Sequence, residues 1–260
     1  MLPAIVLVSL MMAAAPAKAT CRPMDYAVAI DIGHTRANPG AVSATGRQEF
    51  EFNRTLAHEL IAELHRAGFD ASFLINANGT VANLKERSSL ARAGNAALLL
   101  SIHHDSVQLH YLSSWVVNGE SQRYSDRFRG YSLFVSTHNA AYPESLAVAK
   151  LISRELRGRG LTPALHHAEP RPGENRPLLD AELGVYRFDD LVVLRTASMP
   201  AVLLEAGVIV HRGEERLLRQ ISYRQRIVQA VVKAVSAFCE RAREQNGSIK
   251  PAGNVMESGP

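Results

Sequence analysis

Three short apolar runs, each typical of a buried strand, lead directly into residues that can bind a metal or transfer a proton; they cover residues 29–32, 96–102 and 200–204. The first run delivers His34 after a glycine, the second delivers His103, and the third delivers Glu205. In an open parallel α/β sheet, reacting groups gather in the crevice beyond the carboxyl ends of the strands. The pattern therefore predicts that two imidazoles and a carboxylate meet at one edge of a sheet.

Segments with helical periodicity alternate with these runs along the chain. Apolar residues recur at three- and four-residue spacing in four segments, which lie within residues 52–68, 83–94, 145–156 and 227–238. Asn83 followed by Glu86 resembles a capping box, which marks the start of the second of these helices. The alternation predicts a single α/β domain whose open, mainly parallel, doubly wound sheet is flanked by helices.

Two polar stretches interrupt the alternation. Residues 105–129 contain tyrosines, serines and the single tryptophan, and they predict a long loop or a hairpin. Residues 158–190 are rich in glycine, proline, arginine and glutamate, and they predict a second long surface excursion. We expect these two stretches to form the walls of a groove beside the candidate residues.

The first residues of the chain have the features of a signal peptide. An apolar core over residues 4–15 is too short to span a bilayer comfortably. It is followed by Ala17-Lys18-Ala19, the small-x-small pattern of a signal-peptidase site. An uncleaved anchor is the alternative. We expect residues 1–19 to be a signal peptide cleaved near Ala19, which leaves an exported, periplasmic or extracellular protein with no stable membrane anchor.

The rest of the chain divides into one folded domain, expected over residues 26–243, and a tail. Residues 244–260 lack an apolar period and contain glycine, proline and serine, so they predict a disordered C-terminal tail. The only two cysteines, Cys21 and Cys239, lie at opposite ends of the exported domain. They could form a disulfide in an oxidising compartment, but the sequence does not supply the distance that the bond requires.

The charge pattern gives little support to nucleic-acid binding. The formal net charge is +4, and the arginines are scattered with no interleaved aromatic residues. A mildly basic surface would suit an anionic polymer of the cell envelope, although an ordinary solvated surface would look the same.

The chain contains ten histidines, and two of them stand out. His34 and His103 each follow an apolar strand. The adjacent pair His166 and His167 is less suited to ligation, because neighbours in an extended segment point opposite ways and at most one could reach a shared metal. A second carboxylate, Glu49, follows the loop after His34. Two histidines and two carboxylates at one sheet edge can form a zinc site with three protein ligands, an open position and a neighbouring base.

The order and spacing of the motifs resemble those of the zinc-dependent N-acetylmuramoyl-L-alanine amidases of type 3. The matching segments are Ile30-Asp31-Ile32-Gly33-His34, Pro39-Gly40-Ala41, Gly46 with Glu49 and Asn53, Leu84 with Arg87 and Asn95, Ser101-Ile102-His103, Ser145-Leu146-Ala147, Leu194-Arg195 and residues 200–207. The resemblance spans nearly all of residues 26–240, although Gly94 replaces the family's usual alanine. It implies an open α/β fold and one zinc per chain. The implied activity is cleavage of the amide between N-acetylmuramic acid and L-alanine in peptidoglycan or muropeptides.

The same resemblance implies a role for each site residue. His34, Glu49 and His103 would hold the zinc, and Glu205 would be the general base and acid that works with a zinc-activated water. Glu51 is a rival for the second ligand, but the family's glycine–glutamate–asparagine spacing selects Glu49. Three further residues are candidates for contact with substrate or for orienting a ligand: Arg195, His104 and Asp105.

Three other functions use similar chemistry or the same fold. A zinc exopeptidase or a carbohydrate deacetylase could use the same metal site, and the many arginines would allow an exopeptidase to bind a terminal carboxylate. A non-catalytic peptidoglycan-binding protein is the third alternative, against which the four intact site residues argue.

The connection that precedes the third helix bears on regulation. Some exported members of the family carry there an extra helix that plugs the zinc site until an activator displaces it. Residues 137–144 are too few to form a stable plugging helix. We therefore expect a monomeric enzyme that needs no obligatory activator.

Overall fold

The computed structural model describes residues 22–247. The expected signal peptide, Cys21 and residues 248–260 lie outside the described residues. Leader cleavage, the Cys21–Cys239 disulfide, the domain boundaries and the disorder of the tail therefore stay predictions.

A seven-stranded sheet organises the domain, with the strand order β2-β1-β3-β9-β6-β8-β7. Its strands are β1 (Val28–Ile32), β2 (Phe73–Ile75), β3 (Leu98–Asp105), β6 (Ser132–Val135), β7 (Leu178–Asp180), β8 (Val185–Arg187) and β9 (Ala201–Val208). The pairs β1–β2, β1–β3, β3–β9 and β6–β8 are parallel. The pairs β6–β9 and β7–β8 are antiparallel. The expected open and mainly parallel sheet is confirmed.

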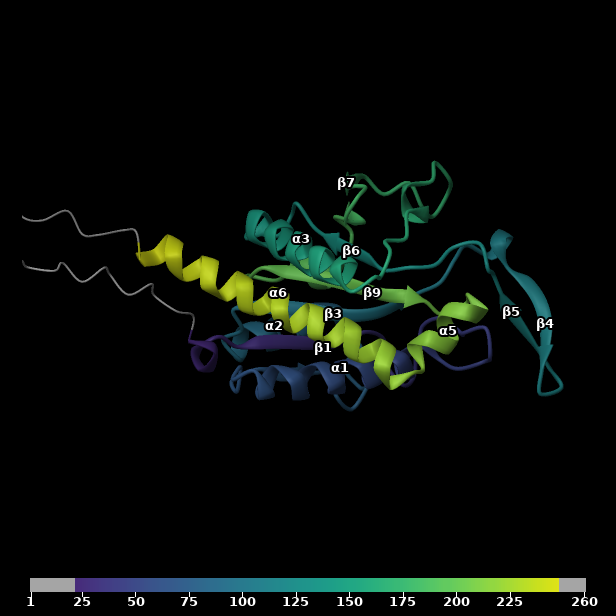
Figure 1. Cartoon of the computed structure of the whole chain (residues 1–260), viewed down its shortest axis with the longest axis horizontal. Helices are drawn as coiled ribbons and strands as arrows, with labels where there is room; N and C mark the ends of the chain where they lie inside the picture. The colour runs from purple at the N-terminus through teal and green to yellow at the C-terminus, as the bar shows by residue number, and fades with distance from the viewer. Residues whose placement is uncertain (1–21, 248–260) are drawn as a thin grey trace, which may run out of the picture.

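Helices cover both faces of this sheet (Figure 1). The longer ones, α1 (Glu49–Arg66), α3 (Tyr142–Gly158) and α6 (Ile221–Gly247), pack in the larger apolar cluster through residues such as Leu56, Ile152 and Val231. The shorter helices α2 (Leu84–Ala93) and α4 (Val192–Arg195) pack in a second cluster, through Ala91 and Leu194. The doubly wound arrangement predicted from the sequence is therefore confirmed.

The alternation of side chains along β3 decides which residues reach the site. Leu100 and Ile102 belong to the larger apolar cluster, whereas Leu99 belongs to the smaller one. Successive residues of a strand point to opposite faces. His103 therefore shares the face of Leu99, and His104 turns toward the larger cluster beneath α1.

The stretch 105–129 forms the hairpin that the sequence allowed. Strands β4 (Ser113–Val117) and β5 (Glu120–Tyr124) pair antiparallel in a sheet of their own. Asn118 and Gly119 both have positive φ angles in the turn between them, as a tight hairpin turn requires. In Figure 1 the hairpin extends beyond one end of the main sheet. The Trp115 indole N–H donates to the Ala44 carbonyl (2.7 Å) and ties the hairpin to the loop before α1.

The expectation of an irregular excursion over residues 158–190 is wrong for its second half. Strands β7 and β8 extend the main sheet, and β8 pairs with β6. Val185 and Tyr186 of β8 are fully buried. Each of the two strands has only three residues, which is too short for a detectable alternation of apolar and polar side chains.

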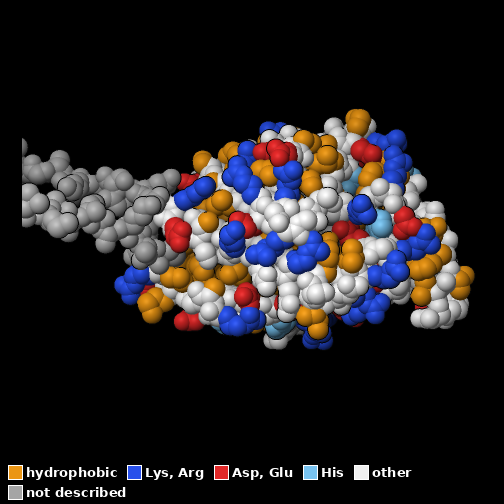
Figure 2. Space-filling model, viewed as in Figure 1, with side chains coloured by type: hydrophobic (Ala, Val, Ile, Leu, Met, Phe, Trp, Pro, Cys, Tyr) orange, Lys and Arg blue, Asp and Glu red, His pale blue; other side chains and the backbone are white. Residues whose placement is uncertain are grey.

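Charged side chains are dispersed over the surface. Figure 2 shows Lys and Arg spread among acidic and apolar side chains on the face that α6 crosses. Within residues 22–247, no helix is both long enough and apolar enough to cross a bilayer.

A buried ion pair joins three elements of the fold. Arg87 on α2 and Asp31 on β1 are 1% and 0% exposed, and Arg87 Nη1 lies 3.1 Å from Asp31 Oδ1. Ser101 on β3 donates its hydroxyl to Asp31 Oδ2 (2.7 Å). Arg87 also donates to the backbone carbonyls of Val81 and His34. The arginine thus satisfies several buried acceptors at once.

We predict that Arg87→Ala destabilises the domain by about 3–5 kcal/mol, because it leaves the Asp31 carboxylate buried and unpaired. Arg92→Ala is the matched control, since Arg92 lies exposed on the same helix; its effect should stay within about 0.5 kcal/mol. Denaturant unfolding of both variants gives the two values. Equal losses would contradict the assigned role of Arg87.

Candidate active site

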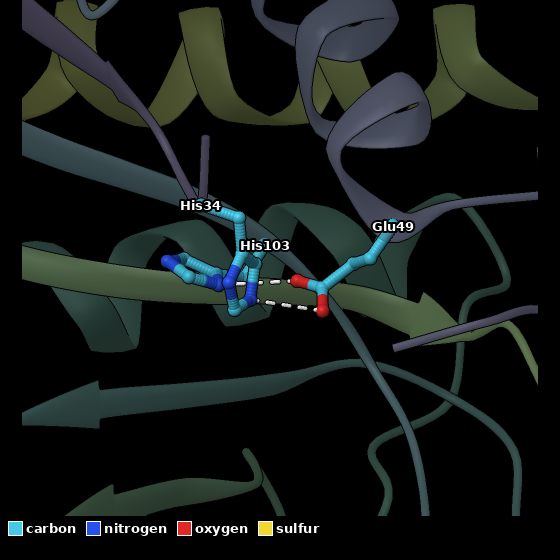
Figure 3. A group of neighbouring side chains, drawn as sticks. All are labelled: His34, Glu49 and His103. Carbon is cyan, nitrogen blue, oxygen red and sulfur yellow. Dashed lines mark hydrogen bonds and ion pairs between the residues drawn. The ribbon is translucent and has the colours of Figure 1, made fainter. Parts of the chain in front are cut away.

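Three side chains from three elements converge at the carboxyl edge of the sheet (Figure 3). His34 follows β1, Glu49 is the first residue of α1, and His103 lies near the end of β3. His34 Nε2 is 2.9 Å from Glu49 Oε2, and His103 Nδ1 is 3.2 Å from Glu49 Oε1. One donor atom from each residue lies within 4.8 Å of the others. The structure therefore brings together the three residues that the sequence proposed as zinc ligands.

His34 is held in an uncommon backbone conformation. Its φ angle is 65°, in the left-handed region that non-glycine residues rarely adopt. Its carbonyl accepts hydrogen bonds from Asn76 Nδ2 and Arg87 Nη2, each at 2.6 Å. Such strain persists only where the surroundings over-determine the conformation. These two donors hold the His34 backbone while its ring turns toward Glu49.

Two glycines allow the backbone to pass close to the cluster. A Cβ atom at Gly33 would overlap the His103 ring. A Cβ atom at Gly40 would overlap both the Glu49 carboxylate and the His34 ring, and the φ angle of Gly40 is +79°. The three candidate ligands therefore lie in a cradle that closes if either glycine gains a side chain.

Backbone and side-chain donors orient the Glu49 carboxylate. It accepts from Asn53 Nδ2 (3.1 Å), from the Ala41 N–H (3.1 Å) and from the His104 N–H (3.3 Å). Burial disfavours its charge, but the hydrogen bonds with His103 and His34 outweigh burial and hold the pKa of Glu49 well below its usual range. The group is thus ionised, the form that binds a metal.

Glu51, the rival for the second ligand, points elsewhere. Its side chain is 46% exposed and pairs with the guanidinium of Arg47 (3.2 Å), which lies just before α1. Glu49 is the carboxylate that joins the two histidines.

His104 lies on the opposite face of β3 from His103 and is 2% exposed. Its Nδ1 and the Asn53 Oδ1 atom are 2.8 Å apart. Burial lowers the pKa of His104 to about 3, so the ring is neutral and Nδ1 donates. Since Asn53 also bonds Glu49, the position of His104 favours orienting that ligand over contact with substrate.

The role of Asn53 was not assigned from sequence, although it appears in the family motif. It lies four residues after Glu49 on the same helix face, and that spacing is the signal that could have revealed the contact.

Glu205 lies beside the cluster on the neighbouring strand. In the register of β3 and β9 it is the direct partner of His103. Its Oε2 atom is buried without a hydrogen-bond partner among the described residues. Burial raises the pKa of Glu205 well above its usual range, and the charges of Asp105 and Glu49 add to the rise. A buried, unpartnered carboxyl next to candidate metal ligands is what a general base or acid requires.

Two cavities flank these residues. A cavity of 280 Å³ is bounded by both His34 and His103 and reaches the residues of α4. A second cavity of 240 Å³ is bounded by Glu205 and Asp105. Leu191 and Leu203 border both, so the two cavities adjoin. Residues 105–108 and parts of 167–176 line the second cavity, as the expected groove walls would.

The remaining candidate, Arg195, has a different position. It ends α4, is exposed and borders neither cavity. Contact between Arg195 and substrate stays a prediction.

The donor set fits zinc. Two imidazole nitrogens and a carboxylate oxygen are the ligands of many catalytic zinc sites, which keep one further position open. The His34 and His103 side chains are 32% and 18% exposed, so the cluster can be reached from the adjoining cavity. The hydrogen bond from Asn53 to Glu49 supplies the outer support that metal ligands commonly have.

Fold and site together define an α/β protein with a candidate metal-dependent hydrolytic centre. A family model described as N-acetylmuramoyl-L-alanine amidase matches residues 28–237. The chain therefore belongs to the N-acetylmuramoyl-L-alanine amidase family, as the motifs predicted.

Individual relatives agree with this assignment. The chain is 27% identical over 233 residues to the probable N-acetylmuramoyl-L-alanine amidase AmiB of Haemophilus influenzae, covering 81% of this chain and 51% of that protein. The chain thus spans about half the length of that relative. It is 25% identical over 223 residues to AmiA of Escherichia coli K12, covering 81% and 75%.

Solved structures share the fold. The crystal structure of the amidase Ami1 from Mycobacterium smegmatis superposes with a TM-score of 0.64 at 20% identity, covering 83% of this chain and 97% of that one. AmiC2 of Nostoc punctiforme gives a TM-score of 0.62 at 19% identity, covering 83% and 98%.

We predict that Glu49→Ala lowers the zinc content by about one ion per chain, because the cluster loses its only carboxylate. Glu51→Ala, the matched control in the same first turn of α1, should keep the zinc of the parent protein. Elemental analysis of purified protein, with circular dichroism to verify folding, measures both. Loss of zinc from the Glu51 variant alone would overturn the ligand assignment.

Proposed function

We propose that the chain hydrolyses the amide bond between N-acetylmuramic acid and L-alanine in peptidoglycan or muropeptides. One zinc ion would be held by His34, Glu49 and His103. The observation that carries the proposal is the position of Glu205, whose buried carboxyl is the cross-strand partner of a candidate ligand. Membership of the amidase family supports the choice of bond.

Amide hydrolysis needs catalysis of both the attack and the departure step, because the carbonyl is a weak electrophile and the nitrogen is a poor leaving group. When bound, zinc supplies Lewis acidity that polarises a carbonyl and acidifies water. Glu205 accepts a proton from the attacking water and passes a proton to the departing alanine nitrogen. Its Oε2 atom has no competing hydrogen-bond partner among the described residues, so it is available for this transfer.

The shape of the site suits a substrate that extends in two directions. The scissile amide has a sugar on its carbonyl side and a peptide on its nitrogen side. The two cavities adjoin at Leu191 and Leu203, one beside the candidate ligands His34 and His103 and the other beside Glu205. They can therefore receive the two parts of the substrate while the amide lies between them, near Glu205.

The alternatives make different products from the same chemistry. A zinc exopeptidase would release terminal amino acids, a carbohydrate deacetylase would release acetate, and a non-catalytic binding protein would release nothing. Digestion of purified sacculi, followed by analysis of the soluble products, separates these three from an amidase, which releases free stem peptides.

We further propose that the enzyme acts outside the cytoplasm, since its substrate is a polymer of the envelope. The signal-peptide pattern of residues 1–19 supports this location.

We predict that Glu205→Gln lowers turnover by about 10²–10⁴-fold, the typical range for the loss of general acid–base catalysis. Zinc content should be unchanged, since Glu205 is not one of the proposed ligands. Glu51→Gln, the same change at a glutamate that points away from the cluster, should leave turnover near that of the parent enzyme. Near-normal turnover of the Glu205 variant would show that another group moves the proton.

We also predict that the purified mature enzyme cleaves muropeptides without an activator. The connection between β6 and α3 covers only residues 136–141, which is too short for a helix that plugs the site. The assay compares purified enzyme alone with enzyme plus an envelope extract. Activity only in the presence of the extract would contradict an open site.

A further inference from the structure

A second cluster of histidine and carboxylate side chains lies on the far side of Glu205. Asp105 ends β3, and His166 and His167 lie in a short 3₁₀ turn over His166–Ala168. Asp105 Oδ2 is 3.2 Å from His166 Nε2 and 2.8 Å from His167 Nε2. The expectation that only one of two adjacent histidines can reach a shared point is wrong here, because the segment is a turn and not an extended strand.

The two clusters have the same types of side chain, two imidazoles and one carboxylate, at similar spacing. In the first, a carboxylate lies 2.9 and 3.2 Å from two imidazole nitrogens. In the second, the corresponding distances are 2.8 and 3.2 Å, and the three donor atoms again lie within 4.8 Å of one another. A geometry that fits a cation at the first cluster therefore fits one at the second.

The second cluster also has the outer support typical of metal sites. His167 Nδ1 lies 2.8 Å from Glu174 Oε2, and Gln108 Nε2 donates to Glu174 Oε1 (3.0 Å). A metal-binding histidine commonly donates its other ring N–H to a carboxylate, which fixes the ring and its tautomer. Glu174 occupies that position for His167 and leaves Nε2 directed at Asp105.

An ion-pair cluster alone does not explain the burial of the His166 ring. Its side chain is 1% exposed, and Nδ1 has no hydrogen-bond partner among the described residues. Nε2 lies 3.2 Å from Asp105 Oδ2 but makes no well-aligned hydrogen bond within the same residues. Phe128 stacks against the ring at 4.9 Å between centroids and supplies no polar contact. Burying a polar group without a partner is costly. A cation bound at Nε2 would give that nitrogen a partner.

We propose that Asp105, His166 and His167 form a second divalent-cation site, distinct from the His34–Glu49–His103 cluster, and that zinc is its preferred ion. Two imidazoles and one carboxylate are a zinc donor set, and three protein ligands leave a position for a further ligand. Asp105 and His167 border the 240 Å³ cavity that also contains Glu205. That cavity is the route by which the ion enters and the space into which its open position faces.

The position of the site gives it a function. The charged neighbours of Glu205 include Glu49 from the first cluster and both Asp105 and His167 from the second. A cation in the second site would offer a ligand position to a carboxylate or carbonyl oxygen lying in the cavity next to Glu205. This contact to substrate rests on the proposed amidase function, whereas the metal site itself does not.

Zinc stoichiometry tests the site. Metal-free protein is titrated with ZnCl₂ in a calorimeter, and the bound zinc is then measured by elemental analysis after desalting. The parent protein should bind about two ions per chain, and His34→Ala and His167→Ala should each bind about one. His110→Ala, an exposed histidine outside both clusters, should still bind about two.

A milder variant is needed in case the loss of the buried His167 ring unfolds the protein. Glu174→Gln keeps the size of the side chain but removes its charge, so it should weaken zinc binding at the second site by about 10–100-fold and leave the first unchanged. Circular dichroism verifies folding of each variant.

The outcomes separate this proposal from the proposed function. A parent protein that binds one ion, lost in His34→Ala and kept in both His167→Ala and Glu174→Gln, would overturn the second site. A single ion kept in His34→Ala and lost in His167→Ala would support the second site and contradict the assigned catalytic zinc.

Discussion

The buried ion pair between Arg87 and Asp31 is the interaction on which the site depends. It joins α2 to β1, and Ser101 extends it to β3. The same guanidinium holds the carbonyl of His34. A buried charge is stable only when its partners are complete. The arginine therefore fixes the packing of three elements and the unusual backbone conformation of a candidate ligand with one set of hydrogen bonds.

The parallel sheet determines where the other site residues lie. β3 lies between β1 and β9, so the loop after β1, the end of β3 and the middle of β9 meet at one edge. His103 and Glu205 face one another because their strands are in register. Asp105 is two residues further along the face of His103, where the β3–β9 register shifts. A few residues of strand thus connect the first histidine cluster, the proposed base and the second cluster.

Much of this could be predicted from the sequence, for definite reasons. Apolar strand runs located His34, His103 and Glu205, and motif spacing selected Glu49 over Glu51. The residues that hold the candidate ligands in place were harder to predict. Arg87 was identified only as a motif residue, and its burial could not be predicted because it depends on Asp31, an acid distant in sequence. The three-residue strands β7 and β8 carry no periodic signal. His166 and His167 both contact Asp105 because they lie in a turn, which the local sequence did not reveal.

The glycine cradle has a consequence for how such a protein can change over time. A side chain at Gly33 or Gly40 would overlap the candidate ligands. Even a small substitution at either glycine would therefore displace a ligand. Ser106 and Arg176, by contrast, line the second cavity from loops outside both clusters, where new side chains are better tolerated. The shape of that cavity can therefore vary without any change to the three candidate ligands.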